Sequence, residues 1–165
     1  MKGTGESFMD NRKQEAAKLV RNHAYAGAGT GLIPVPGLDV AALTGTQINL
    51  LRKLCKLYGV PFSSEQARGL IAALIGGVAP AAIGTGMVGS LVKAIPFFGT
   101  VMGFAIMPAL SWASTTAVGH VFIQHFETGG TLLDFDADKM RDFYNQQLAK
   151  ARAETPADLS AEKAA

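Results

Sequence analysis

Apolar and polar positions alternate with helical periodicity near both ends of the chain and lose that alternation in the middle. Over residues 9–26, apolar side chains recur at three- and four-residue steps with basic residues between them, which predicts an amphipathic surface helix. Residues 38–58 place leucines along one side, carry a cluster of Lys and Arg near their end, and stop at Tyr58-Gly59. The first part of the chain therefore predicts two amphipathic helices.

Two further helices are predicted from their start signals. Residues 63–66, Ser-Ser-Glu-Gln, supply an N-cap and an early acidic residue for a third helix. Near the C-terminus, Asp136 is placed to cap a helix that runs through Tyr144, and Asp138 to interact with the dipole of that helix. The last residues, 152–165, are polar and are expected to be disordered.

The middle of the chain carries almost no charge. Residues 69–92 contain no Asp, Glu, Lys or Arg, and after Lys93 the next such residue is Glu127. Each stretch exceeds the roughly 20 residues that cross the hydrocarbon core of a bilayer. The segment 93–99, Lys-Ala-Ile-Pro-Phe-Phe-Gly, separates them and supplies one Lys at the tip. The pattern thus predicts a membrane-embedded helical hairpin over about residues 69–126, with both termini on the cytoplasmic side.

Prolines are the expected points of helix breakage. The candidates are Pro34, Pro36, Pro80, Pro96 and Pro108. Pro80 and Pro108 lie inside the uncharged stretches, where a proline releases a backbone carbonyl and kinks or breaks a helix. Alternatively, Pro80 splits residues 69–92 into two short helices, which fit the buried core of a bundle as well as a re-entrant membrane element.

Small residues recur at four-residue steps in both uncharged stretches, and such rows let helix backbones approach closely, as they do in membrane bundles. The predicted helix-packing residues are Gly69, Ala73, Gly77, Ala81, Thr85, Gly89, Gly99 and Gly103. After a break at Met107, the second row continues through Ser111, Thr115 and Gly119. These rows predict close helix packing and, through it, a homo-oligomer.

The segments together predict an all-α fold, a helical bundle with a membrane-embedded hairpin. Residues 1–8 are expected to be a flexible N-terminus, residues 9–151 a single helical domain, and residues 152–165 a disordered tail. A hydrophobic share of 48% excludes a disordered protein, and a charged share of 17% is below that of ordinary soluble domains. Composition therefore favours contact with a membrane.

Charge narrows the range of partners. The formal net charge is +2, and the basic residues are concentrated before the uncharged middle without aromatic residues among them. Nucleic acid is therefore not an expected partner. Binding to an anionic lipid surface does not need basic residues in so ordered an arrangement, and the lipid bilayer is therefore the expected partner. The single cysteine, Cys55, excludes an internal disulfide, and the first residues lack the apolar run of a signal peptide, which predicts the cytoplasmic membrane as the location.

Candidates for catalytic, cofactor and metal sites are weak. The glycines of residues 27–31 follow no predicted strand and precede no Gly-Lys-Ser/Thr, which argues against a nucleotide loop. The carboxylates of residues 134–138 lack the glycine and the closing glutamate of a calcium loop. His120 and His125 lie on different sides of a helix. We predict no catalytic residue, no cofactor and no metal, and hence no enzyme.

Asp39 and Gln47 are candidates for polar contacts with a partner. Their spacing places them on nearly the same face of the second predicted helix, where they could present polar groups inside a helical assembly or to another protein. A structural alternative exists for Asp39, because a carboxylate in the first turn of a helix interacts with the positive end of the helix dipole.

Three blocks in fixed order carry a family resemblance. They are residues 31–39 (GLIPVPGLD) with Gln47 and Tyr58-Gly59, residues 93–99 (KAIPFFG), and residues 119–130 (GHVFIQHFETGG). Over about residues 15–150 the chain resembles the bacterial YcjF-like family, domain of unknown function 697. The resemblance implies a helical membrane protein of the kind often associated with P-loop GTPases, either fused or as neighbours.

The leading functional hypothesis is a non-enzymatic, self-associating adaptor or scaffold in the bacterial inner membrane. Because the chain has no GTPase domain of its own, the resemblance implies a separate P-loop GTPase as its partner. One alternative is a pore or membrane-shaping oligomer, which the kinked, glycine-rich helices suggest. The other is a soluble helical bundle that forms a shell or binds a hydrophobic ligand.

Overall fold

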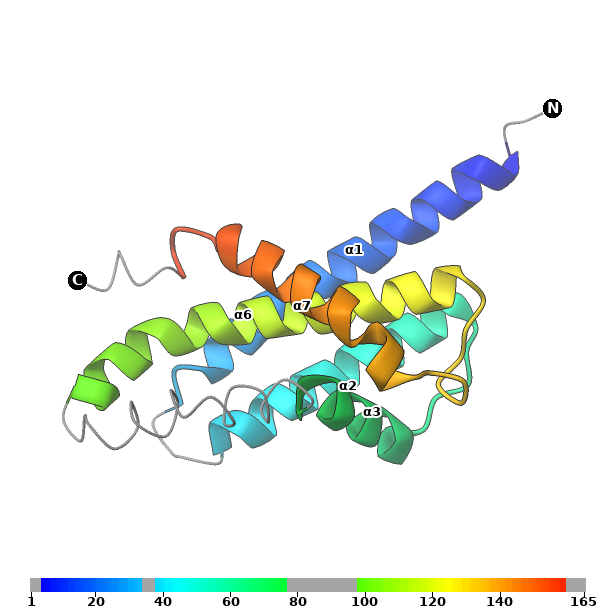
Figure 1. Ribbon diagram of the computed structural model, residues 1–165. Helices are drawn as coiled ribbons and strands as arrows, with labels where there is room; N and C mark the ends of the chain where they lie inside the picture. Colours follow the sequence, from blue (N-terminus) through cyan, green and yellow to red (C-terminus); the bar gives the residue numbers. More distant parts are fainter. Residues whose placement is uncertain (1–3, 34–37, 77–97, 160–165) are drawn as a thin grey trace.

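The computed structural model describes residues 4–33, 38–76 and 98–159, and within these ranges the regular secondary structure is helical (Figure 1). The helices are α1 (Thr4–Thr30), α2 (Leu38–Tyr58), α3 (Ser64–Gly76), α6 (Phe98–Glu127) and α7 (Ala137–Ala153). The predicted all-α class is confirmed.

The second half of α6 forms the centre of the described bundle. α6 packs mainly against α1 and α7 and also contacts α2, whereas α3 rests on α2 and α7 (Figure 1). Side chains of α6 such as Ala117, Val121 and Phe122 are fully buried, as are Leu50 and Leu54 of α2. Burying a leucine or phenylalanine side chain contributes about 1.5–3 kcal/mol. Apolar burial along α6 is therefore what holds the helices together.

Local signals set the helix ends where the sequence predicted them. After α2, Gly59 adopts a φ of +69°, which favours glycine, and the Val60 amide donates to the Cys55 carbonyl at 2.8 Å. Asp136 precedes α7, and its carboxylate accepts hydrogen bonds from the amides of Asp138 and Lys139 at 3.1 and 3.2 Å. The predicted cap at Asp136 is confirmed.

α1 is longer than the helix predicted over residues 9–26. It begins at Thr4 and continues through Gly27 and Gly29 to Thr30. Its first turns extend past the rest of the described bundle (Figure 1). Glycine lowers helix propensity by about 1 kcal/mol relative to alanine, but Gly27 is buried against α6. Tertiary packing therefore carries the helix beyond the point at which local propensity predicts its end.

Pro108 does not end the helix in which it lies. α6 is continuous from Phe98 to Glu127 with Pro108 inside it, so the predicted break is wrong at this position. The end of α1 packs against the backbone of Met107 and Pro108, which supports α6 at the point where one of its own hydrogen bonds is missing. The other predicted breaks, Pro34, Pro36, Pro80 and Pro96, lie outside the described residues.

The predicted membrane-embedded hairpin over residues 69–126 receives no support from the described helices. None of them combines the length and the apolarity that crossing a bilayer requires. From Ser111 to Phe126, the segment expected to form the second arm is instead enclosed by α1, α2 and α7. A helix that is apolar on all sides is equally suited to a bilayer and to the centre of a bundle, and the second environment holds for this half of α6.

Candidate functional site

Close approach of α1 to α6 fixes the geometry of the bundle. A Cβ atom added at Gly27 would lie 2.7 Å from Thr115 Oγ1, and one at Gly31 would lie 2.7 Å from the backbone nitrogen of Pro108. On the α6 side, Gly119 lies directly against a valine of α1. The small-residue row predicted through Thr115 and Gly119 therefore packs against α1 of the same chain.

Two other predicted helix-packing residues, Gly69 and Ala73, belong to α3 and not to this contact. Gly69 and Ala73 lie on the exposed side of α3, and the space around Gly69 is open. Gly99 and Gly103 lie in the first turns of α6. Outside the described residues are Gly77, Ala81, Thr85 and Gly89. Self-association through these rows stays a prediction.

A buried line of polar side chains connects α2, α6 and α7. Gln47, only 1% exposed, donates from Nε2 to Ser114 Oγ at 3.3 Å, and Ser114 Oγ lies 3.4 Å from the Tyr144 hydroxyl. Burial raises the pKa of Tyr144 above its ordinary value, so its hydroxyl stays protonated and able to donate. Gln47 thus meets its polar partner inside the chain. Asp39 is half-buried in the first turn of α2, away from this line.

The end of the bundle at which α2 and α6 finish is sealed by polar contacts, and we call it the closed end. Glu127, with a side chain 13% exposed, accepts a hydrogen bond of 2.6 Å from the Tyr58 hydroxyl and lies 3.7 Å from both Arg12 Nε and Lys13 Nζ. The Arg12 guanidinium also lies 4.8 Å from the centre of the Tyr58 ring. Burial and the neighbouring Glu127 raise the pKa of Tyr58. This cluster joins α1, α2 and α6.

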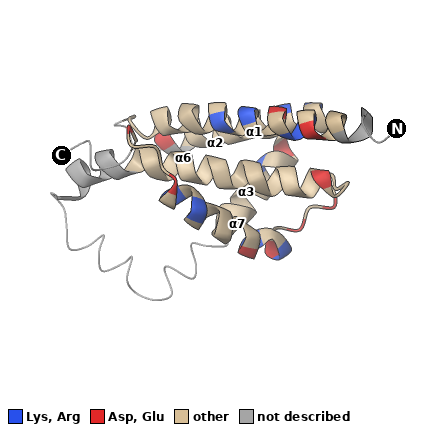
Figure 2. Cartoon of the chain, turned by 90° about the horizontal axis from the view of Figure 1, so that it is seen from above, with Lys and Arg blue, Asp and Glu red and all other residues tan. Residues whose placement is uncertain are grey.

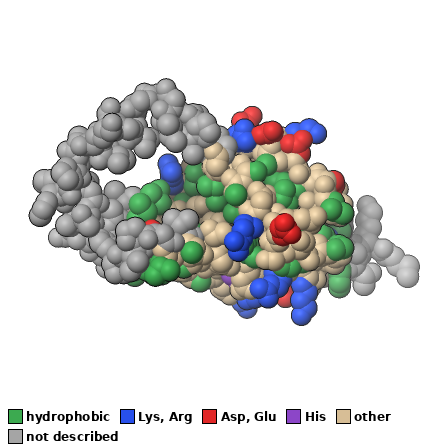
Figure 3. All heavy atoms as spheres, turned by 90° about the horizontal axis from the view of Figure 1, so that it is seen from below, with side chains coloured by type: hydrophobic (Ala, Val, Ile, Leu, Met, Phe, Trp, Pro, Cys, Tyr) green, Lys and Arg blue, Asp and Glu red, His purple; other side chains and the backbone are tan. Residues whose placement is uncertain are grey.

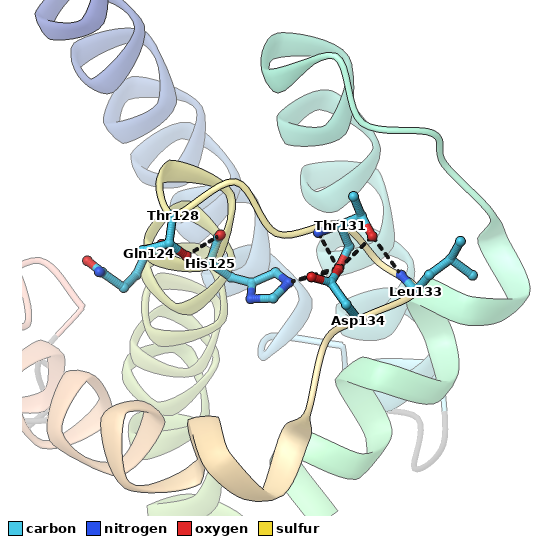
Figure 4. A network of polar contacts seen from close by, with 6 residues as sticks. All are labelled: Gln124, His125, Thr128, Thr131, Leu133 and Asp134. Carbon is cyan, nitrogen blue, oxygen red and sulfur yellow. Dashed lines mark hydrogen bonds and ion pairs between the residues drawn. The ribbon is translucent and has the colours of Figure 1, made fainter.

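The loop that follows α6 completes the closed end (Figure 4). Both the amide and the hydroxyl of Thr131 donate to Asp134 Oδ1, at 2.5 and 2.6 Å, and these hydrogen bonds lower the pKa of Asp134. The ring of His125 donates from Nε2 to the Thr131 carbonyl at 2.8 Å. Leu132 and Phe135 are buried, while Leu133 between them is 82% exposed. The loop is therefore held rigidly by its own side chains.

The carboxylates of this region are engaged in capping and pairing. Asp136 caps α7 and lies 3.2 Å from Lys139 Nζ, while Asp138 lies 2.6 Å from Arg141 Nη2. Within the described ranges, no group of His, Cys, Asp and Glu side chains is arranged to hold a metal ion. Cys55 is fully buried, and burial raises its pKa to about 11, which keeps the thiol protonated.

The opposite end of the bundle exposes large apolar side chains, and we call it the open end. Leu32 after α1 is 61% exposed, Leu38 at the start of α2 is 57% exposed, and Met107 of α6 is 44% exposed. The contact of Gly31 with the backbone of Met107 brings Leu32 next to α6. Along α6 the first Asp, Glu, Lys or Arg is Glu127, at the closed end (Figure 2).

The open end was not predicted from the sequence, because the predictions were based on the small residues and on the lengths of the uncharged stretches. A usable signal was the pair of leucines, Leu32 and Leu38, close to either side of the sequence Pro-Val-Pro-Gly. A turn between two surface helices is ordinarily polar, so apolar residues at both of its edges point to a partner or a membrane.

Comparison with known proteins gives one family and one curated relative. Residues 4–153 match a family described as Domain of unknown function (DUF697), and the match contains all three blocks that carry the resemblance. Magnetosome membrane protein 22 of Magnetospirillum gryphiswaldense is 37% identical over 138 residues, which is 84% of this chain and 71% of the relative. No solved structure matches significantly.

Proposed function

The chain belongs to the family of domain of unknown function 697, and from that premise we propose that it is a non-enzymatic scaffold attached to a membrane by its open end. The name of its relative, a magnetosome membrane protein, supports the membrane part of the proposal. In this proposal the closed end and the outer side of α7 remain in water, where they are accessible to other proteins.

The observation that carries the proposal is the exposure of Leu32, Leu38 and Met107 at one end of a bundle whose other end is sealed by polar contacts. Transfer of each leucine from water into an apolar environment yields about 1.5–3 kcal/mol. The sequence also contains residues 77–92, which include no charged residue. Apolar side chains and an uncharged segment together suit the boundary between head groups and acyl chains.

This proposal gives the uncharged stretches two different roles. Residues 111–126 serve as the centre of the bundle, and the membrane-contacting part is reduced to the open end and the uncharged segment before α6. The cytoplasmic face of the bacterial inner membrane remains the proposed location.

Partners follow from the family and from the surface. A separate P-loop GTPase is proposed as the partner because proteins of the resembled family are often associated with such enzymes. Self-association is proposed through small residues, and the exposed Gly69 and Ala73 of α3 support it because they permit close approach of another helix.

The enclosed position of α6 favours a second candidate function. A helical bundle that forms a shell or binds a hydrophobic ligand would also bury an uncharged helix at its centre. In that case the open end would contact another protein copy or the ligand instead of lipid.

Flotation with lipid vesicles separates the two candidates. The full chain, purified in mild detergent and then diluted, is mixed with phosphatidylcholine vesicles and centrifuged through a density gradient. Co-flotation that survives a high-salt wash is the expected result. A monodisperse particle that remains at the bottom of the gradient without detergent would overturn membrane attachment and favour the second candidate.

A further inference from the structure

Four basic side chains are exposed on the outer side of α1 and α2, and we call this set the basic face. It consists of Lys18, Arg21, Lys53 and Lys56. Of the other described cations, Arg12, Lys13, Lys139 and Arg141 each lie within ion-pair distance of a carboxylate, whereas Arg52, Arg68, Lys150 and Arg152 do not. No member of the basic face has such a partner within the part of the chain that the structure describes.

The members of the basic face are close together although they come from two helices. Asn22 of α1 and Lys53 of α2 line one open groove between the helices. Lys18, Arg21 and Asn22 line the adjoining hollow on α1, which also includes Glu15 as its one acidic residue. Basic side chains gather along one margin of the described bundle in the view from below (Figure 3). The basic face therefore carries more positive than negative charge.

The basic face is continuous with the apolar side chains of the open end. Along α1, Lys18, Arg21 and Tyr25 follow one another at three- and four-residue steps, which places them on one side of the helix, and Leu32 comes just after the end of the helix. Tyr25 is 44% exposed and Leu32 is 61% exposed. Apolar side chains thus lie toward the open end, and cations lie farther along the same side.

We propose that this side of α1 and α2 lies on a membrane rich in anionic phospholipids, with the basic face against the head groups. The inference rests on the proposed membrane attachment and adds the lipid class and the orientation of the bundle. An apolar edge inserted beside a row of cations is the arrangement by which surface helices bind anionic bilayers. Each Lys or Arg near such a surface strengthens binding about fivefold at physiological salt.

The test compares two vesicle compositions and two matched variants of the full chain. The vesicles are pure phosphatidylcholine, and phosphatidylcholine mixed with phosphatidylglycerol. The Lys18→Gln/Lys53→Gln variant removes two charges from the basic face, and the Lys150→Gln/Arg152→Gln variant removes two exposed charges from α7. Thermal unfolding followed by circular dichroism confirms that both variants fold.

The wild-type chain is expected to bind the mixed vesicles at least tenfold more tightly, with the gain abolished by high salt. The basic-face variant should lose about thirtyfold on mixed vesicles and almost nothing on neutral ones, because two cations are removed. The α7 variant should bind as the wild type does.

Three results would overturn the inference and leave the proposed function standing. Equal binding of the wild type to both vesicles would leave membrane attachment intact and exclude the anionic preference. An equal loss in the α7 variant would mean that net charge alone acts. A basic-face variant that binds mixed vesicles normally would assign these cations to an acidic protein surface instead. Failure to bind either vesicle would instead refute the proposed function, and the inference with it.

Discussion

The two ends of the bundle are formed by the same helices but expose different kinds of side chain. At the closed end, Glu127 gathers Tyr58, Arg12 and Lys13, and the following loop satisfies its own polar groups through Thr131 and Asp134. At the open end, Leu32, Leu38 and Met107 remain exposed. An end that is to remain in water needs its buried polar atoms paired, whereas an end that meets lipid needs apolar area.

The comparison shows that exposure alone does not mark the membrane end. Leu133 at the closed end is 82% exposed, more than either leucine of the open end. In its loop it is the one exposed apolar side chain, beside Asp134, and the exposed Phe8 and Met9 belong to the first turns of α1. The leucines of the open end, by contrast, flank the sequence Pro-Val-Pro-Gly, which carries no charge. Scattered apolar residues are normal on protein surfaces, and clustered ones indicate an interaction.

The largest effect is expected for the double variant Leu32→Glu/Leu38→Glu. It replaces two membrane-contacting side chains by charges, and binding to vesicles should fall about a hundredfold while thermal stability stays unchanged. Leu133→Glu is the matched control at the closed end and should bind vesicles as the wild type does. If the control loses as much binding as the double variant, the two ends do not differ in their relation to lipid.

Gly31→Ala should destabilise the open end by about 2 kcal/mol, because its Cβ would collide with the backbone of Met107 and Pro108. Gly29→Ala is the control, since Gly29 lies two residues earlier, in α1, with open space around it, and alanine there should stabilise by up to about 1 kcal/mol. Denaturant unfolding measures both changes. A harmless Gly31→Ala would refute the close contact of α1 with α6.

Glu127→Gln should cost about 1.5 kcal/mol, because Arg12 and Lys13 lose their anionic partner and the Glu127 side chain is only 13% exposed. Vesicle binding should not change, since the substitution affects only the closed end. Asp142→Asn removes an exposed carboxylate of α7 and should alter the free energy of unfolding by less than about 0.5 kcal/mol. Equal effects of the two substitutions would show that the Glu127 cluster does not seal this end.

The smallest effect concerns the pH response of the loop after α6. The pKa values of Asp134 and Asp136 are lower in the folded chain than the ordinary 3.8, chiefly because of hydrogen bonds from Thr131 and Lys139 respectively. Their stabilisation is therefore complete above about pH 3.8 and is lost as the pH falls through the folded pKa values. Hydrogen exchange at the amides of Thr131 and Leu133, corrected for intrinsic rates, should accelerate as the pH falls through the folded pKa values. In Asp134→Asn this acceleration should be much weaker.

Local rules predicted the helices and several of their ends. The Gly59 stop and the Asp136 cap depend on a few neighbouring residues, so sequence alone suffices for them. The extension of α1 through Gly27 and the continuity of α6 through Pro108 depend instead on contacts between the two helices. No local pattern contains that information.

The surroundings of α6 are what the sequence determines least. An uncharged helix has the same composition whether lipid or protein surrounds it, and the difference lies in whether other helices supply matching apolar faces. Here α1, α2 and α7 do so around Phe122 and its neighbours. Gln47 was predicted as a candidate for polar contacts with a partner, and nothing in its own helix reveals its contact with Ser114 of the same chain.

The sharpest distinction between the ends would come from an environment-sensitive fluorophore attached to Leu32→Cys in one sample and to Leu133→Cys in another. The native Cys55 can remain because it is fully buried with a protonated thiol. With vesicles containing quencher-labelled lipids, fluorescence at position 32 should shift to the blue and be quenched, and fluorescence at position 133 should not change. Quenching at position 133, or none at position 32 while the protein is bound, would contradict attachment through the open end.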